Sequence, residues 1–314
     1  MRILFWGTSS FAVPSLRALA GEGFDVVGVV TQPDRAVGRS RSELIPSPVK
    51  EAALEQSMPL FQPEKPRGEE FLAALRALEP DLSVVASYGH ILTQEVIDLP
   101  GRGTINVHAS LLPKFRGAAP IQAVIREGLL ETGVTIMRLV RALDAGPIVL
   151  QARTPVARDE TAGELELRLS ELGALALVEA VTLLELGQAS ERAQDDASAT
   201  YAPKIEREMA RVNWEEGCGV VARAIRAYDP KPGAFTTHHA DEVKLYGAAE
   251  TDAAGDEGTT RFGTVLAIDD SGMLVSCGDG AVRVAQAHPA GKKRLSAAEW
   301  QRGRGISIGD RLGA

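Results

Sequence analysis

The sequence predicts an α/β fold in two parts, a mostly parallel sheet domain followed by a small β-barrel. In the first half, short apolar runs alternate with amphipathic helical segments, a pattern typical of a parallel sheet covered by helices on both faces. After residue 206, Val or Leu alternates with polar residues in short strands that Gly and Asp separate, which is typical of a small antiparallel barrel.

The individual elements follow from these two patterns. The expected strands of the first half are residues 2–6, 24–30, 82–86, 104–108, 134–140 and 148–153. Its expected helices are residues 14–20, 47–56, 68–78 and 161–186. The first has Pro14 in its opening turn, where the missing N–H is not needed, and the last is capped by a threonine. The second half contains one expected helix, 219–228, and expected strands at 234–238, 242–247, 262–268, 273–277 and 281–287.

Composition places the domain boundaries. Residues 188–198 are polar and acidic, without apolar periodicity, and are typical of a connecting segment. We therefore expect a first domain at 1–187, a linker at 188–205 and a second domain at 206–314. The length of 314 residues agrees with two domains of ordinary size.

Composition also excludes several classes of protein. Only Cys218 and Cys277 are cysteines, so a disulfide scaffold and a zinc site with several thiolates are not expected. The five histidines form no metal-binding motif, and His238-His239 is expected to be a surface pair that lacks a third ligand. No apolar run reaches the length of a membrane span, and the amino terminus does not have the pattern of a secretory signal. We expect a protein of the reducing cytoplasm that carries no metal.

Asn106 and His108 are the most informative pair, because they stand two residues apart in the expected strand 104–108. Alternate side chains of a strand share a face, so both polar groups point the same way near its carboxyl end. In open α/β sheets that edge is where ligands bind. Asp144 ends another strand-and-turn pattern and is placed to approach the same edge.

These three residue types suit the transfer of an acyl group to an amine. An Asn106 amide can stabilise negative charge on the carbonyl oxygen, and His108 can protonate a leaving nitrogen. The Asp144 carboxylate would favour the imidazolium and could accept a proton from the attacking amine. The segment has no thiol or activated serine, which favours direct transfer. The residues alone leave open a structural Asn–His pair and a simple turn aspartate.

The motifs around these residues resemble the folate-dependent formyltransferases. The resemblance starts from NVHASLLP at 106–113 and continues through 116–122, 131–137 and 143–146. Within the family the sequence is most similar to the branch that acts on methionyl-tRNA, through segments 31–35, 46–50, 200–205 and 289–293. The resemblance covers nearly the whole chain. It implies a Rossmann-like formyltransferase domain followed by an OB-like barrel that binds tRNA.

The resemblance also implies roles for residues. Asn106, His108 and Asp144 would catalyse transfer of the formyl group of 10-formyltetrahydrofolate to the α-amino group of methionine on initiator tRNA, the step that prepares it for translation initiation. In the expected sequence of events, Asn106 and His108 stabilise the oxyanion and His108 protonates the departing folate nitrogen. A loop made of Ser110, Leu111, Leu112 and Pro113 would bind the folate. Tyr88 and Gly89 would form a second wall of the site.

The tRNA contacts are expected at local basic patches, because the net charge of −8 argues against indiscriminate binding to nucleic acid. The patches implied by the resemblance contain Arg35, Arg39 and Arg41 in the loop 31–50, then Lys204, and finally Lys292 and Lys293. The loop departs from the family pattern, with Ser40-Arg41-Ser42-Glu43 where lysines are common. Without the resemblance, exposed loops with incidental basic residues explain the same sequence. The protein is expected to act as a monomer.

Three alternatives are weighed against this interpretation. Formyltransferases that act on glycinamide ribonucleotide or on an amino-sugar nucleotide share the chemistry, but residues 206–314 do not suit either. A nicotinamide oxidoreductase would need a G-x-G-x-x-G turn, and the first strand is followed instead by Gly7-Thr8-Ser9-Ser10. A non-catalytic nucleic-acid-binding protein would need no polar cluster at a strand end.

Overall fold

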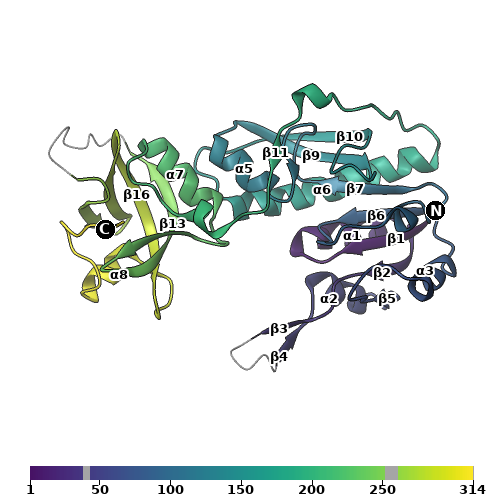
Figure 1. Ribbon diagram of the computed structural model, residues 1–314, viewed down its shortest axis with the longest axis horizontal. Helices are drawn as coiled ribbons and strands as arrows, with labels where there is room; N and C mark the ends of the chain where they lie inside the picture. The colour runs from purple at the N-terminus through teal and green to yellow at the C-terminus, as the bar shows by residue number, and fades with distance from the viewer. Residues whose placement is uncertain (38–42, 252–260, 314) are drawn as a thin grey trace. The chain divides into compact units, whose positions relative to one another are not determined.

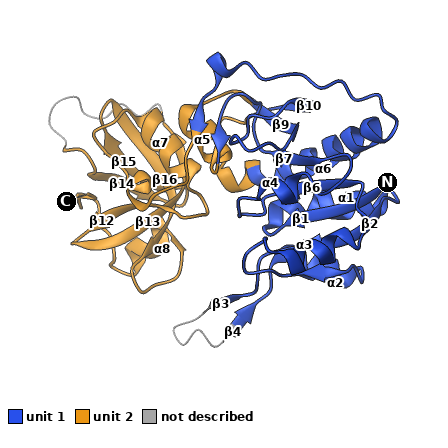
Figure 2. Ribbon diagram, turned by 45° about the vertical axis from the view of Figure 1, so that its right-hand side comes forward, with its two compact units in different colours: residues 1–117, 132–154, 166–201 blue, residues 118–131, 155–165, 202–314 orange. Residues whose placement is uncertain are grey.

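The computed structural model describes residues 1–37, 43–251 and 261–313, which form two compact units (Figure 2). Unit 1 contains residues 1–117, 132–154 and 166–201, and unit 2 contains residues 118–131, 155–165 and 202–314. Two segments of the first half, 118–131 and 155–165, therefore group with the carboxyl-terminal residues. The expected boundaries at 187 and 206 were placed by composition, which does not report such contacts, and as functional domains they stay a prediction.

Unit 1 is built on a seven-stranded sheet in the order β10-β9-β7-β6-β1-β2-β5 (Figure 1). The strands are β1 (Arg2–Gly7), β2 (Asp25–Val30), β5 (Leu60–Phe61), β6 (Leu82–Ala86), β7 (Thr104–His108), β9 (Glu131–Arg138) and β10 (Ile148–Pro155). The pairs β5–β2, β2–β1, β1–β6 and β6–β7 are parallel, and β9 runs antiparallel to β7. The predicted mostly parallel, Rossmann-like sheet is confirmed.

The strands form because their side chains are buried on both faces. Ile3, Leu4, Phe5 and Trp6 of β1 are all at most 1% exposed, as expected for the centre of a parallel sheet. The helices of the first half are α1 (Val13–Gly21), α2 (Pro48–Glu55), α3 (Glu69–Arg76), α4 (Gln94–Ile97), α5 (Pro120–Glu127) and α6 (Ala162–Glu185). The short elements α4, α5 and β5 are not predicted from the sequence, since an element of two to eight residues gives little periodicity.

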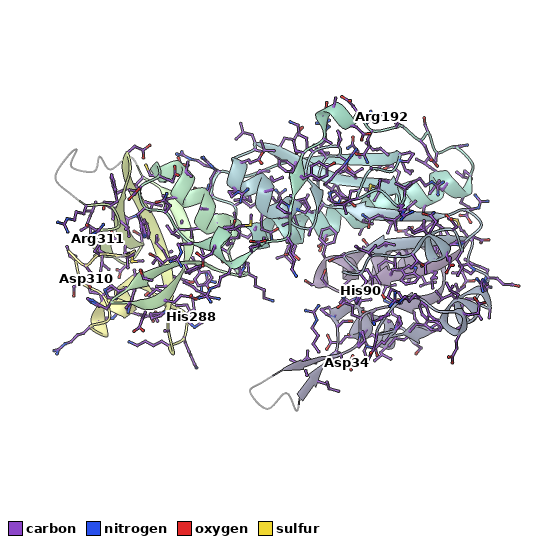
Figure 3. The ribbon with its side chains drawn as sticks, viewed as in Figure 1. Asp34, His90, Arg192, His288, Asp310 and Arg311 are labelled. Atoms are coloured by element: carbon purple, nitrogen blue, oxygen red, sulfur yellow. The ribbon has the colours of Figure 1, made fainter. Side chains whose placement is uncertain are left out.

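The segment expected to be a linker packs against unit 1 instead of connecting freely. Arg192 exchanges two backbone hydrogen bonds with Ile148, at 2.8 and 2.9 Å, and its side chain is labelled in Figure 3. Further along, the Asp196 carboxylate accepts a 2.7 Å bond from the buried Arg116 guanidinium. A two-residue strand, β8 (Arg116–Gly117), pairs with β11 (Tyr201–Ala202). We call residues 188–200 the strap. The Asp196 bond shows that a polar side chain of the strap is used within the protein.

Two short strands leave the main sheet of unit 1. β3 (Arg35–Val37) and β4 (Glu43–Ile45) are antiparallel, with Arg35 opposite Ile45 (Figure 1). They belong to the loop in which the sequence predicts contacts to tRNA.

Unit 2 packs helix α7 (Cys218–Ala227) against an antiparallel sheet in the order β12-β13-β16-β15-β14. The strands are β12 (Ala234–His238), β13 (Asp241–Glu250), β14 (Val265–Asp269), β15 (Gly272–Cys277) and β16 (Gly280–Pro289). β17 (Leu295–Ser296) pairs with β16 and leads into α8 (Ala297–Arg302). The Trp214 and Trp300 rings lie in the core of this unit. The predicted antiparallel second domain is confirmed.

The last described residues connect the two edge strands of this sheet. The N–H groups of Gly309 and Leu312 donate to the carbonyls of Val265 and Gly263, each at 2.8 Å, on the β14 side. The Gly313 N–H donates to the Thr237 carbonyl of β12, also at 2.8 Å. Residues 309–313 therefore occupy the space between β14 and β12 and close the sheet into a barrel.

The closing segment also corrects the expectation for His238 and His239. His238 is only 7% exposed, and its Nε2 lies 3.1 Å from the Asp310 carboxylate. Potential metal-ligating atoms of His238, His239 and Asp310 all lie within 4.8 Å of one another. The pair is thus neither fully on the surface nor without a third neighbour, because Asp310 arrives from a distant part of the sequence.

Among the described residues, no helix has both the length and the apolar character that crossing a membrane requires.

Candidate active site

The carboxyl ends of β6 and β7 lie side by side and carry most of the predicted site. Val85 pairs with Asn106 and Ala86 with Val107 in parallel register, so the residues that follow both strands emerge at the same edge of the sheet. Asn106 and His108 are two positions apart on β7 and share a face. The structure therefore brings the β7 pair to the ligand-binding edge that the sequence predicts.

The His108 ring is buried, with an oxygen acceptor near each of its nitrogens. Its Nε2 donates to the Phe115 carbonyl at 2.9 Å, and its Nδ1 lies 3.8 Å from Oδ2 of Asp144. The side chains of His108 and Asp144 are only 6% and 12% exposed. The expected proximity of Asp144 to the imidazole is thus present in the structure.

Burial lowers the pKa of His108, and the Asp144 charge and the Phe115 carbonyl oppose this effect without overcoming it. The imidazole is therefore mainly neutral at pH 7. Since Nε2 donates to Phe115, the neutral ring carries its proton there and leaves Nδ1 free to accept one. A proton that arrives at Nδ1 would be stabilised by the Asp144 carboxylate.

Asp144 is held by backbone and strap contacts. Its Oδ2 accepts a 2.7 Å bond from the Gly117 N–H, and its φ of 47° lies in the left-handed region. From the strap, the Gln194 amide donates to the carbonyls of Asp144 and Gly146, at 2.7 and 2.8 Å. The Arg116 guanidinium donates in turn to the Gln194 carbonyl oxygen at 2.8 Å. Gln194 and Arg116 are positioning residues that sequence reasoning missed, and only their place in or near a family motif could have drawn attention to them.

Asn106 differs from the buried, hydrogen-bonded His108 and Asp144. Its side chain is partly exposed, and within the described residues no hydrogen-bond partner is found for its amide. The amide is therefore available to donate to a substrate oxygen.

The loop predicted to bind folate is largely bonded within the protein. Thr135 connects its two ends: its hydroxyl donates to the Ser110 carbonyl at 2.7 Å and accepts from the Leu112 N–H at 3.1 Å. Gln151 donates to the Leu112 carbonyl at 2.9 Å, and the Leu112 side chain is buried against Met137 and Ile148. In the described part of the chain, the N–H groups of Ser110 and Leu111 have no partner.

The remaining carbonyls of this loop are also used. The Leu111 carbonyl accepts from the Lys114 N–H, and the Pro113 carbonyl accepts from the Thr200 N–H of the strap. Within the described chain, the loop is therefore held by several bonds of its own and offers two adjacent unpaired N–H groups, those of Ser110 and Leu111.

Tyr88 and Gly89 follow β6 at the same edge, but the Tyr88 ring belongs to the core. It is 2% exposed and packs edge-on against Trp6 with ring centroids 5.3 Å apart, and burial raises the pKa of its phenol to about 12. Its carbonyl accepts bonds from Thr8 and from Gln32, each at 2.8 Å. Gly89 has a φ of 86°, and a Cβ there would lie 2.6 Å from the Gln32 amide nitrogen. Backbone atoms are what this pair can offer a ligand.

The predicted tRNA-contacting residues divide into three groups. Arg35 is exposed on β3, whereas Arg39 and Arg41 lie outside the described residues. The Lys50 ammonium donates to both Asp34 oxygens, at 2.9 and 2.6 Å, and this bond lowers the pKa of Asp34. Lys50 and Asp34, which is labelled in Figure 3, therefore neutralise each other and add no net charge to the loop.

In unit 2, Lys204, Lys292 and Lys293 are exposed. Their neighbour Arg294 differs, because its guanidinium lies 3.9 Å from the centre of the Tyr246 ring. Arg294 is thus used in packing, whereas no ion pair of Lys292 or Lys293 is found among the residues that the structure describes.

The two cysteines are not poised as nucleophiles. Burial raises the pKa of Cys277 to about 12, and burial together with the Asp279 bond raises the pKa of Cys218. Neither thiol is ionised at neutral pH.

Comparison with known proteins identifies the family. The model described as "Formyl transferase" matches residues 1–181, and the one described as "Formyl transferase, C-terminal domain" matches residues 204–305. The chain belongs to the formyl transferase family. The resemblance predicted from the motifs is confirmed.

Relatives of similar length carry the comparison further. The chain is 42% identical over 313 residues to a methionyl-tRNA formyltransferase of Moorella thermoacetica, covering 100% of this chain and 99% of the relative. It is 44% identical over 312 residues to a methionyl-tRNA formyltransferase of Thermotoga neapolitana, covering 99% and 98%. Among solved structures, HypX from Aquifex aeolicus in complex with tetrahydrofolic acid matches with a TM-score of 0.66 and 21% identity. That match covers 98% of this chain and 48% of HypX, and it supports the fold alone.

Proposed function

We propose that this chain transfers the formyl group of 10-formyltetrahydrofolate to the α-amino group of methionine on initiator methionyl-tRNA, and so acts as a methionyl-tRNA formyltransferase of translation initiation in the cytoplasm. The observation that carries the proposal is the identity of 42–44% to methionyl-tRNA formyltransferases along nearly the full length of both chains. The grouping of Asn106, His108 and Asp144 at one sheet edge supports it, since these residues suit the chemistry.

The residues of the site fit a formyl donor. When bound, the folate supplies a one-carbon unit on a nitrogen that can leave. The free N–H groups of Ser110 and Leu111 provide two donors for polar atoms of the ligand, and the Asn106 amide provides a third for the formyl oxygen. Tyr88 and Gly89 would contribute backbone atoms to another wall of the site.

Proton movement would be centred on Nδ1 of His108. The neutral imidazole accepts the proton that the methionyl amine loses, and Asp144 stabilises the imidazolium that results. The same nitrogen then returns the proton to the departing folate nitrogen. Nε2 remains bonded to Phe115 throughout, which keeps the ring in one orientation.

The acceptor tRNA would contact the basic groups that the resemblance implies. These are Arg35, Arg39 and Arg41 in the loop 31–50, and Lys204, Lys292 and Lys293 in unit 2. Lysine and arginine contacts to phosphates position a nucleic acid without reading its sequence. We propose that the protein binds its tRNA as a monomer and that it needs no metal for the transfer.

The deciding experiment supplies the purified protein with labelled 10-formyltetrahydrofolate and one of three acceptors. We expect label on initiator methionyl-tRNA and little on charged elongator tRNA or glycinamide ribonucleotide. Transfer to glycinamide ribonucleotide would reassign the substrate. Binding of tRNA without transfer to any acceptor would refute the proposed activity.

A further inference from the structure

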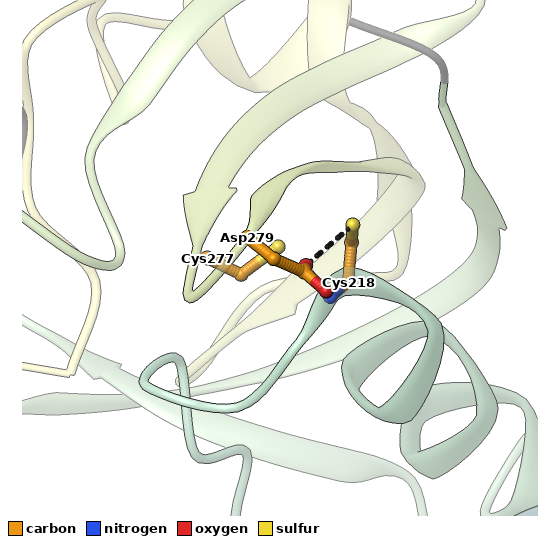
Figure 4. A group of neighbouring side chains, drawn as sticks. All are labelled: Cys218, Cys277 and Asp279. Carbon is orange, nitrogen blue, oxygen red and sulfur yellow. Dashed lines mark hydrogen bonds between the residues drawn. The ribbon is translucent and has the colours of Figure 1, made fainter. Parts of the chain in front are cut away.

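The only two cysteines of the sequence meet at one point in unit 2, beside an aspartate (Figure 4). Cys218 is the first residue of α7, Cys277 is the last residue of β15, and Asp279 lies in the turn between β15 and β16. The two sulfur atoms and a carboxylate oxygen all lie within 4.8 Å of one another. Figure 4 shows the hairpin end that carries Cys277 and Asp279 facing the start of α7.

The close approach depends on two glycines. A Cβ on Gly278 would lie 2.3 Å from the Glu215 carbonyl oxygen, and one on Gly217 would lie 2.6 Å from Oδ2 of Asp279. Without side chains at these positions, the Gly278 N–H reaches the Glu216 carbonyl at 2.8 Å. The turn is therefore held close to the residues before α7, and a side chain at position 278 would clash there with backbone.

Asp279 connects both sides of this cluster. Its Oδ1 accepts from the backbone N–H of Cys218 at 2.6 Å and from the Cys218 thiol at 2.9 Å. Capping the helix start accounts for the first bond and would be served by a carboxylate alone. It does not account for the presence of both thiols of the chain at the same place.

The three groups have the chemistry and spacing of ligands for a thiophilic metal ion. In a tetrahedral zinc site, bonds of about 2.3 Å to sulfur and about 2.0–2.2 Å to oxygen place the ligand atoms roughly 3.5–3.8 Å apart. In the metal-bound site, the Cys218 sulfur and the Asp279 oxygen would separate by about 0.6 Å from their 2.9 Å contact, and the other ligand atoms already lie within 4.8 Å of one another. Thiolates select soft or borderline ions such as Zn²⁺ over Mg²⁺ and Ca²⁺.

Exposure is graded across the cluster. Cys277 is 5% exposed, Cys218 is partly buried, and Asp279 is exposed, so an ion can enter from one side and keep a water molecule as its fourth ligand. We propose that Cys218, Cys277 and Asp279 form a site for a divalent cation of the zinc class that ties the β15–β16 turn to α7. Binding forms two metal–sulfur bonds and releases both thiol protons to solvent.

The test uses Co²⁺ as the probe and the full chain, freed of metal with a chelator and kept reduced with a phosphine. We expect a sulfur-to-cobalt charge-transfer absorption that saturates at one Co²⁺ per chain and disappears on addition of Zn²⁺. Cys218→Ser and Cys277→Ala should abolish this absorption. Asp279→Asn should keep it and weaken Co²⁺ binding by about 10–100-fold or more, since even loss of an outer-shell partner costs that much.

A matched control distinguishes this site from the other group with metal-ligand spacing in the described residues. His239→Asn disrupts the His238–His239–Asp310 group, which has no sulfur, and should leave the charge-transfer absorption unchanged. The absence of this absorption in the reduced, folded protein would overturn the proposal, as would its persistence in Cys218→Ser. Disulfide formation detected by thiol titration, without Co²⁺ uptake by the reduced protein, would also overturn it. Because Cys218 is partly exposed, its serine variant remains informative even if Cys277→Ala fails to fold.

Discussion

Replacement of Asp144 by asparagine should separate the charge of this residue from its structural contacts. Asparagine can still accept the Gly117 N–H through its side-chain oxygen, and it tolerates the left-handed φ of 47° better than most residues. What Asp144→Asn removes is a negative charge 3.8 Å from Nδ1 of His108. The variant should therefore fold normally and fail in catalysis.

The size of the effect follows from that separation. Two unit charges about 4 Å apart interact by about 4 kcal/mol at the effective dielectric constant typical of protein sites. If the proton passes through Nδ1, the imidazolium in Asp144→Asn loses up to this stabilisation, and kcat falls by up to about 1,000-fold. The pKa of His108 should fall further, because Asp144 is one of the groups that support its protonated form.

The assay measures formyl transfer to initiator methionyl-tRNA between pH 5 and pH 9. This range extends about 1.5 units below and about 2.5 units above the reference pKa of histidine. Thermal unfolding is recorded in parallel. The control is Asp25→Asn, which removes a mostly exposed carboxylate from the amino end of β2, the opposite edge of the sheet. A loss below about tenfold with an unchanged pH profile would show that the Asp144 charge does not act on His108 in the reaction.

Three further changes test other parts of the structure. Asn106→Ala should lower kcat by about 10²–10³-fold, or about 2.7–4 kcal/mol, without lowering the unfolding temperature, because the amide has no partner in the described residues; near-normal turnover would remove it from the site. Combined alanine substitution of Lys292 and Lys293 should weaken tRNA binding and flatten its dependence on salt while folate affinity stays constant, and an unchanged salt slope would contradict the predicted contact. Gly133→Ala should destabilise unit 1 by about 3 kcal/mol in thermal unfolding, because its Cβ would lie 2.0 Å from the Ala152 carbonyl oxygen. Gly21→Ala is the control, because a Cβ there meets open space, and equal effects of the two substitutions would refute the steric argument.

The elements that sequence reasoning predicted best are those with a strong local pattern. The apolar runs of β1, β6 and β7 are recognisable because a strand buried on both faces contains little else. The helix α6 begins at Ala162 and is capped by Thr161, as predicted, and its Glu164 completes the cap by accepting from the Thr161 N–H. Such signals lie within a few residues of one another, so the sequence displays them directly.

The site was predictable only in part, because only some of its contacts are between residues that are close in sequence. The face shared by Asn106 and His108 follows from strand geometry alone. The approach of Asp144 to His108 depends on the path of the chain between two strands, and the motif resemblance supplied it. The Phe115 carbonyl is a backbone group without a residue-type signal, so it could not be predicted at all.

The strap shows the limit of composition. Gln194 lies in a polar segment typical of a linker, and nothing local indicates that its amide bonds the Asp144 backbone. Asp310 is a similar case, because it reaches His238 across 72 positions of sequence. Contacts between distant polar residues carry no periodicity, and structure alone reveals them.

Closure of the barrel by residues 309–313 has a consequence for biosynthesis. A ribosome extends the chain by about 5–20 residues per second, and amino-terminal domains usually fold before synthesis ends. Unit 1 has all its strands once residue 201 has emerged. The edge of β14, and the edge of β12 beyond the Val212–Phe235 bond, must instead wait until residues 309–313 leave the exit tunnel. Nascent chains stalled before that point would therefore carry a finished first unit and a second one still open to nonspecific strand pairing.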